Sequence, residues 1–284
     1  MVDATVRGER PVVELRGLVK HFRAVTAVDG LDLVVPAGAR VGLLGPNGAG
    51  KTTTLLMLLG VILPDAGTVH LVGRELPRQR SKALEQVGFV AGYLPLPENL
   101  TVRESLEIFA GFYGIRRPSP VVSAAIERFG VEVLADRRGQ ELSSGQRTLV
   151  GIVKAVLHRP RLLVLDEPTA SLDPDVALRA RAALLDVHRE DGTALLVTSH
   201  NMREVEMLCE RVVILARGRI AADGTPAEIA THFGTADLEG AFLEVAGQVV
   251  PEGGPALVTP EAWAGPSSPD AWAGPSSPEA WAGQ

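Results

Sequence analysis

The sequence predicts an α/β fold with a mostly parallel core sheet, an antiparallel β-layer and an α-helical lobe. A glycine-rich loop lies between an apolar strand and an apolar helix over residues 39–59, and a second apolar run, residues 161–167, ends in two acids. Continuous apolar strands that alternate with helices are typical of a parallel sheet buried on both faces. Ligands bind at the carboxyl ends of such strands, so both features indicate one functional edge.

Two strands are expected before the glycine-rich loop. Residues 12–15 and 31–35 alternate between apolar and polar side chains, which is the period of a half-buried strand. We expect them to form the antiparallel β-layer. Residues 39–44 have the pattern of a short buried strand, and residues 53–59 that of an apolar helix. The loop therefore has the strand before it and the helix after it that a phosphate-binding loop requires.

The middle of the chain, from about residue 101 to 140, is expected to be helical. Residues 102–109 have helical apolar spacing, and Thr101 followed by Glu104 is a capping-box pattern. A second helix is expected over residues 121–129.

The elements expected nearer the C-terminus are a hairpin and two short helices. Residues 212–215 and 219–222 have strand patterns joined by a Gly-containing turn. A capped helix is expected from Thr225, and a short one over residues 238–245.

The glycine-rich loop fits the pattern G-x-x-x-x-G-K-[ST]. Glycines let backbone N–H groups wrap a phosphate chain, and the following helix N-terminus adds positive dipole. Lys51 is expected to reach the β- and γ-phosphates, and Thr52 to offer a hydroxyl to Mg²⁺. The alternative is a glycine-rich turn before a chance Lys-Thr pair, but it does not account for the flanking strand and helix. The pattern predicts a P-loop NTPase fold whose phosphate-binding residues are Gly45, Pro46, Asn47, Gly48, Ala49, Gly50, Lys51, Thr52 and Thr53.

The two acids after the second apolar run suit hydrolysis. Asp166 is expected to hold Mg²⁺, directly or through water, and Glu167 to orient or deprotonate the attacking water. From this segment alone, a buried strand followed by a solvated acidic turn is an equal alternative. Weighed together with the phosphate-binding loop, the hydrolytic interpretation is favoured.

Residues 142–146 carry the most specific pattern. Alone, they read as the N-cap of a helix that continues through residues 152–157. They also resemble the L-S-G-G-Q signature of the ATP-binding subunits of ABC transporters, with Ser144 in place of the first Gly. The phosphate loop precedes this signature and the acidic strand follows it, so the chain resembles an ABC ATPase domain over residues 11–247, with its helical signature lobe at about 95–155. The resemblance implies ATP and Mg²⁺ as cofactors.

The resemblance assigns roles to three further residues. Phe22 resembles the aromatic that stacks on adenine, although an ordinary core Phe is an even alternative. His200 follows the buried-strand pattern of residues 195–199 and resembles the switch histidine that contacts the γ-phosphate. A lone His at a strand end is otherwise more often structural. Asp173 ends Ser-Leu-Asp, which resembles the loop that crosses the dimer interface.

In the family, two subunits pair head to tail, and each ATP lies between one phosphate loop and the signature of the other subunit. Ser143, Gly145 and Gln146 are therefore expected to bind the ATP held by a partner subunit, where Ser143, Gly145 and the helix start donate hydrogen bonds to the γ-phosphate. Closing the dimer excludes water and couples nucleotide state to subunit separation. Homodimer and heterodimer both remain open, and a transmembrane permease subunit is the implied partner.

Two positions depart from the family pattern. Gly92 stands where the family usually carries a Gln that reaches Mg²⁺ and the attacking water. Glycine has no side chain for either task, so we expect weakened or differently wired coupling between hydrolysis and transport. Leu149 stands where the family often has Arg.

Composition narrows the class of protein. The net charge of the 284 residues is −6, which disfavours nucleic acid as the main partner. The first ten residues are polar, and no apolar run is long enough to span a membrane. The single cysteine, Cys209, is expected to be buried and reduced. We expect a peripheral protein held at the cytoplasmic face of the cell membrane by its partner.

The last part of the chain, residues 248–284, is a Pro/Gly/Ser/Trp repeat tail that is expected to be disordered. From Pro260 a nine-residue unit repeats, and it holds all three tryptophans, Trp263, Trp272 and Trp281. A repeat expansion without a selected role is favoured, and a Trp-anchored tether for a partner or membrane is the alternative.

The leading hypothesis is an ATP-hydrolysing subunit that powers transport, with export as the expected direction. Family members of this kind serve drugs, as in multidrug export, or lipids and polysaccharides, and the sequence leaves the cargo open. The alternatives are a soluble ABC-type ATPase and a regulatory nucleotide-binding module. Glu167 and His200 argue against the regulatory module.

Overall fold

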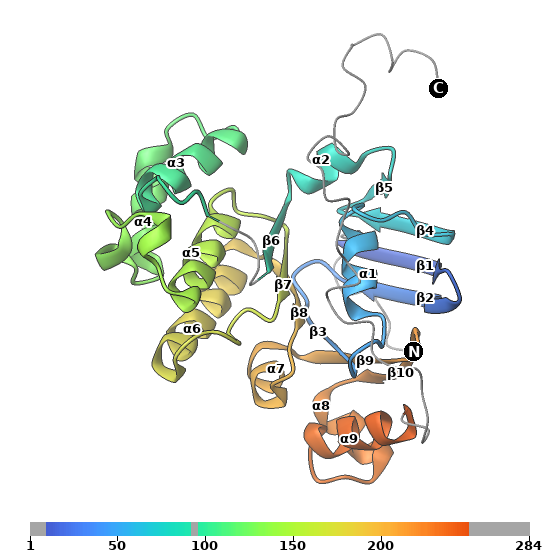
Figure 1. Ribbon diagram of the computed structural model, residues 1–284. Helices are drawn as coiled ribbons and strands as arrows, with labels where there is room; N and C mark the ends of the chain where they lie inside the picture. The colour runs from blue at the N-terminus through green and yellow to red at the C-terminus, as the bar shows by residue number, and fades with distance from the viewer. Residues whose placement is uncertain (1–9, 92–95, 250–284) are drawn as a thin grey trace, which may run out of the picture. The chain divides into compact units, whose positions relative to one another are not determined.

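A computed structural model describes residues 10–91 and 96–249 (Figure 1). They form two β-sheets and a set of helices, which confirms the predicted α/β fold. The position of Gly92 and the repeats that begin at Pro260 lie outside the described residues.

The smaller sheet is antiparallel and has the strand order β2-β1-β4-β5. The first two strands are longer than the alternation predicts. Gly17 and Gly30 adopt positive φ angles and the register shifts near them, so the alternation is interrupted although the strands continue. Its strands are β1 (Val13–Phe22), β2 (Val25–Val35), β4 (Ala66–Leu71) and β5 (Arg74–Leu76).

The larger sheet has the order β10-β9-β3-β8-β7-β6, and only the β9–β10 pair is antiparallel. The strands that carry the expected site, β3, β8 and β7, are neighbours in this order. Their carboxyl ends therefore meet at one edge, as the sequence predicts. The strands are β3 (Arg40–Leu44), β6 (Val87–Ala91), β7 (Leu162–Asp166), β8 (Ala194–Thr198), β9 (Arg211–Ala216) and β10 (Arg219–Gly224).

The helices include the expected helical lobe, in which α3, α4 and α5 gather on one side of the large sheet (Figure 1). The predicted capping box at Thr101 is formed, and the predicted cap at Thr225 is a capping box as well. The helices are α1 (Lys51–Leu58), α2 (Arg80–Leu84), α3 (Val102–Phe112), α4 (Pro118–Arg128), α5 (Ser144–Val156), α6 (Pro174–Asp191), α7 (Met202–Leu208), α8 (Pro226–Phe233) and α9 (Leu238–Val249).

The larger sheet is buried on both faces. In β7, Leu162 and Val164 pack into one hydrophobic cluster, with α1 and the smaller sheet. Leu163 and Leu165 pack into the other, with the helical lobe. Each fully buried Leu contributes roughly 1.5–3 kcal/mol to stability. The edge that carries the expected site therefore belongs to a sheet that is packed on both faces.

Candidate functional site

The glycine-rich loop joins β3 to α1 and depends on its glycines. Gly45 and Gly50 have φ angles of 151° and 104°. A Cβ at Gly45 would lie 2.4 Å from the Leu215 carbonyl oxygen, and one at Gly50 would lie 2.4 Å from that of Ala27. A larger residue at either position would push the loop off β9 or β2. Helix α1 begins without a side-chain cap, so its first N–H groups remain available to an anion.

Lys51 folds back over this loop. Its Nζ donates hydrogen bonds to the carbonyl oxygens of Gly45, at 2.6 Å, and Pro46, at 3.2 Å. Burial lowers the pKa of Lys51, while the charges of Glu167 and Asp166 raise it. The ammonium group thus lies between the loop and the acidic strand end, where it can bind a phosphate chain.

Asp166 ends β7 and is held from the neighbouring strand. Thr198 is its register partner in β8, and the Thr198 hydroxyl donates to Asp166 Oδ1 at 2.5 Å. Within the described residues no hydrogen bond to Asp166 Oδ2 is found. A free carboxylate oxygen and the exposed Thr52 hydroxyl are hard donors that suit Mg²⁺, which keeps several water or phosphate ligands. The two residues therefore fit the predicted magnesium site.

Glu167 and His200 form a pair at the same edge. His200 Nε2 lies 3.2 Å from Glu167 Oε1, and the His200 backbone N–H donates to Glu167 Oε2 at 3.3 Å. Burial raises the pKa of Glu167, and contact with His200 opposes that rise. Glu167 also has a φ angle of +53°, which is uncommon for a residue with a side chain and recurs at functional sites. The carboxylate is thus a stronger base than a free Glu, and both of its oxygens are held by contacts with His200.

The signature residues use their polar groups to cap their own helix. Ser143 is the N-cap of α5: its hydroxyl accepts from the Gln146 N–H at 3.2 Å, and Gln146 Oε1 accepts from the Ser143 N–H at 3.0 Å. A Cβ at Gly145 would lie 2.6 Å from the Ser171 carbonyl oxygen, so the helix start packs on the segment before Asp173. The predicted N-cap is confirmed. No hydrogen bond or ion pair joins Ser143, Gly145 or Gln146 to the phosphate loop within residues 10–91 and 96–249.

Phe22 lies at the end of β1 with 39% of its surface exposed, which contradicts the core alternative. The Lys20 ammonium lies 5.6 Å from the ring centroid. The open ring can stack on a base. Asp173 is exposed and immediately precedes α6.

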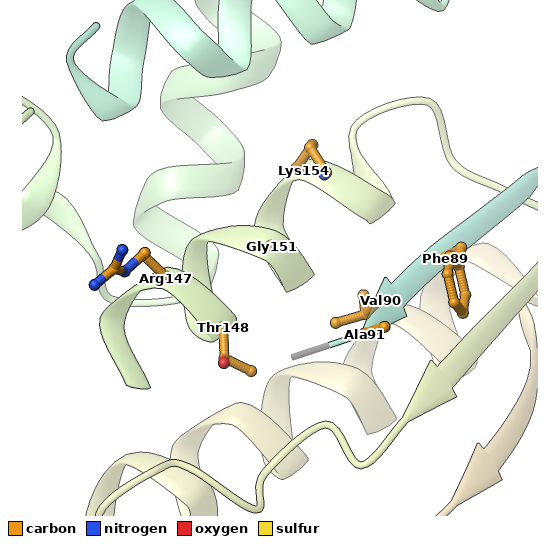
Figure 2. A pocket seen from close by; sticks show the side chains of 7 residues that line it. All are labelled: Phe89, Val90, Ala91, Arg147, Thr148, Gly151 and Lys154. Carbon is orange, nitrogen blue, oxygen red and sulfur yellow. The ribbon is translucent and has the colours of Figure 1, made fainter. Parts of the chain in front are cut away.

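A pocket between β6 and α5 is a separate feature (Figure 2). Its volume is about 10 Å³, the room of a single water. Lys154 lines it and also lies 4.7 Å from the Phe109 ring centroid. This pocket is too small for a nucleotide.

Leu149, which stands where the family often has Arg, is buried in the hydrophobic cluster of the helical lobe. A leucine suits that apolar position.

Sequence reasoning missed two residues behind the acidic edge, Thr198 and Glu204. Glu204 is only 1% exposed, on the apolar face of α7 with Met202, Val205 and Leu208. A charged residue inside a helical apolar pattern is the signal that marks such a position.

Comparison with known proteins agrees with this geometry. Residues 28–170 match the family described as ABC transporter. The Nod factor export ATP-binding protein I of Ralstonia nicotianae is 38% identical over 252 residues, which cover 86% of this chain and 75% of that protein. The protein of the same name from Paraburkholderia xenovorans is 39% identical over 233 residues, 80% of this chain and 75% of that protein.

Solved structures share the fold. The structure of an ATP-binding subunit of an ABC transporter matches with a TM-score of 0.77 at 28% identity, covering 83% of this chain and 99% of that one. A part of an ABC transporter complex from Clostridium perfringens matches with a TM-score of 0.69 at 25% identity, covering 78% and 92%.

Proposed function

The chain belongs to the family of ABC transporter ATP-binding subunits and is an ATPase, and from this premise we propose that it powers export across a membrane. The observation that carries the proposal is the convergence of three loops at adjacent strand ends. The phosphate loop follows β3, Asp166 and Glu167 end β7, and His200 follows β8.

The residues at this edge divide the reaction among them. The phosphate loop and Lys51 bind the β- and γ-phosphates, and Phe22 stacks on adenine. Mg²⁺, bound by Thr52 and Asp166, would neutralise charge on the phosphate oxygens. Glu167 takes a proton from the attacking water, which its raised pKa favours. His200, 3.2 Å from that carboxylate, holds it in position and would contact the γ-phosphate.

The signature acts on the ATP of a second subunit in this proposal. Ser143 is exposed, and its contacts within the described chain are those of its own helix cap. Ser143, Gly145, Gln146 and Asp173 would complete the ATP site of a partner ATPase subunit, identical or different. Closure of this dimer on ATP, and its opening after hydrolysis, would drive the transport cycle.

The proposed membrane partner is a separate transmembrane permease, which holds the chain at the cytoplasmic face of the cell membrane. Among the described residues, no helix has the length and apolarity that a membrane crossing demands. Export is proposed because the relatives are named for Nod factor export. Those names leave the cargo of this chain open. Multidrug export is one narrower possibility.

Steady-state phosphate release with Mg-ATP tests the catalytic assignment. Glu167→Gln is expected to lose at least about 100-fold in kcat, the usual worth of a general base. The matched control is Glu206→Gln, the same change at an exposed position on α7, which is expected to leave kcat unchanged. Wild-type turnover in Glu167→Gln would contradict the assignment.

Inverted membrane vesicles test the direction. Vesicles that contain the chain and its copurified permease are expected to accumulate cargo when Mg-ATP is added outside. ATP-dependent release of preloaded cargo would instead mean import. Vesicles with Glu167→Gln serve as the control and are expected to do neither.

A further inference from the structure

We propose that Glu204 is a positioning residue that holds the catalytic pair in place by bridging the two loops that carry it. The inference rests on the proposed roles of Glu167 and His200. Glu204 lies in α7, behind the acidic edge of the sheet, and is 1% exposed. It does not need to touch ATP or the attacking water to act.

The contacts of its carboxylate define the bridge. Glu204 Oε1 accepts a short hydrogen bond from the Thr169 hydroxyl, and Oε2 accepts one from the Ser199 hydroxyl at 2.5 Å. The Ser199 oxygen in turn accepts from the Asn201 N–H at 3.1 Å. Both carboxylate oxygens are thus engaged by hydroxyl donors that are themselves buried.

The two donors come from different loops. Thr169 is two residues beyond Glu167, in the connection from β7 to α6. Ser199 immediately precedes His200, in the connection from β8 to α7. A single side chain therefore links the two loops from behind, in addition to the backbone pairing of β7 with β8 and the hydrogen bond from the Glu167 N–H to the Thr198 carbonyl oxygen. The bridge matters because the positive φ of Glu167 must be held by its surroundings.

Packing alone does not explain a carboxylate at this position. Burying a carboxylate is costly unless it is hydrogen-bonded or paired. In the part of the chain that the structure describes, no ion pair of Glu204 is found, so its two hydroxyl donors are the compensation. An apolar side chain would fill the same space without that cost. What only the carboxylate supplies is two fixed acceptors, one for each loop.

Measurement of kcat and of KM for ATP on the full-length protein tests the bridge. Glu204→Ala is expected to lower kcat by about 10- to 100-fold, because a displacement of about 1 Å in a catalytic group can cost 100-fold. KM for ATP is expected to stay within twofold, since among the described residues no hydrogen bond or ion pair joins Glu204 to the phosphate loop or to Phe22. Glu204→Gln keeps the shape and one of the two acceptor oxygens, so its loss of kcat is expected to be severalfold, smaller than that of Glu204→Ala. Glu206→Ala, on the exposed face of the same helix, is the matched control.

Single-hydroxyl variants test the same bridge when Glu204→Ala is poorly folded. Thr169→Val and Ser199→Ala each remove one donor and are each expected to lower kcat severalfold. Where Glu204→Ala does fold, either hydroxyl variant combined with it is expected to add nothing to its loss, because the bond is already broken. Additive losses, or a rise in KM that matches the fall in kcat, would overturn the bridge and leave a merely structural role.

The two proposals can fail separately. Wild-type kcat in Glu204→Ala, with Glu167→Gln inactive, would overturn the bridge and leave the catalytic pair intact. Full turnover in Glu167→Gln would overturn the catalytic pair itself.

Discussion

The proposed catalytic edge (Gly45–Thr52, Asp166, Glu167 and His200) and the signature helix α5 satisfy their polar groups in different ways. At the edge, groups that end or follow β7 and β8 contact one another, Thr198 with Asp166 and His200 with Glu167, and Lys51 bonds the loop that precedes it. At α5, the side-chain hydrogen bonds found for Ser143 and Gln146 among the described residues run across one helical turn. The edge is assembled from groups far apart in the sequence, whereas the signature presents an exposed helix start whose cap is local.

A subunit-complementation experiment tests this difference between the edge and the signature, and it has the largest expected effect on turnover. Lys51→Met disables the phosphate loop and Ser143→Arg the signature, so each variant alone is expected to be inactive. In a mixed dimer, one site combines two disabled halves and the other combines two intact ones. Because half of the dimers in an equal mixture are mixed, each with one intact site, turnover is expected to recover to about a quarter of wild type. Phosphate release from the mixture measures this recovery.

The control is a mixture of Lys51→Met with Lys51→Met, Ser143→Arg, which has no intact site in any pairing. No recovery in the first mixture, with both proteins folded, would contradict a shared site. Turnover by Ser143→Arg alone would show that the signature is not needed.

Much of the catalytic edge is predictable from the sequence because its signals are local. Gly45–Thr52 is one continuous pattern and Asp166 ends a continuous apolar run, so strand adjacency is the only tertiary assumption for them, whereas the role of His200 rests on the family resemblance. The capping boxes at Thr101 and Ser143 are also local, since donor and acceptor are three residues apart.

The rest depends on tertiary contacts or on weak apolar signals. Helix α6 buries Ala177, Ala180 and Ala183, whose spacing is helical but whose small side chains give little apolar contrast. The bridge at Glu204 joins residues 35 and 5 positions away, and no periodic pattern encodes the first of these. The extension of β1 to Phe22 is hidden by the irregularity at Gly17.

Alanine substitutions at one glycine of the edge, Gly50, and one of helix α5, Gly151, compare the two regions by their effect on the free energy of unfolding. Gly50→Ala forces a side chain onto φ +104° and within 2.4 Å of the Ala27 carbonyl oxygen, so a loss of about 1–3 kcal/mol is expected. Gly151→Ala, inside α5 with nothing within 4 Å, is expected to gain about 0.5–1 kcal/mol. Urea unfolding of the two variants measures both changes. Equal effects would mean that the loop tolerates a Cβ as well as the helix does.

The pH dependence of kcat/KM tests the electrostatics of the edge. Burial raises the pKa of Glu167 above its ordinary 4.5, and His200 opposes the rise. A base must be ionised to act, so kcat/KM is expected to fall as the pH drops through this raised pKa, at a higher pH than for a free Glu. His200→Asn removes the opposing charge and is expected to move the acid limb to still higher pH. An acid limb at the same pH in His200→Asn and in the wild type would contradict an electrostatic contact between His200 and Glu167.

The same pKa predicts a stability effect of opposite sense to the activity effect. Because the folded protein binds a proton at Glu167 more tightly than the unfolded chain, ionised Glu167 destabilises the fold at pH values above its raised pKa. Glu167→Gln is therefore expected to raise Tm at pH 8, and the gain is expected to vanish below pH 4.5. Thermal unfolding at both pH values measures it, with Glu206→Gln as the control.

Phe22 gives the smallest expected effect, because stacking on a base is only one of several contacts with ATP. Phe22→Ala is expected to raise KM for ATP about five- to tenfold, which corresponds to roughly 1 kcal/mol of stacking. Phe22→Trp is expected to leave KM near wild type, since any aromatic face can stack. Phe112→Ala removes an even more exposed ring, on α3 of the helical lobe, and is expected to leave KM unchanged. Equal KM values in the two alanine variants would remove Phe22 from the ATP site, and the end of β1 would then lie outside the region that one chain assembles around its own nucleotide.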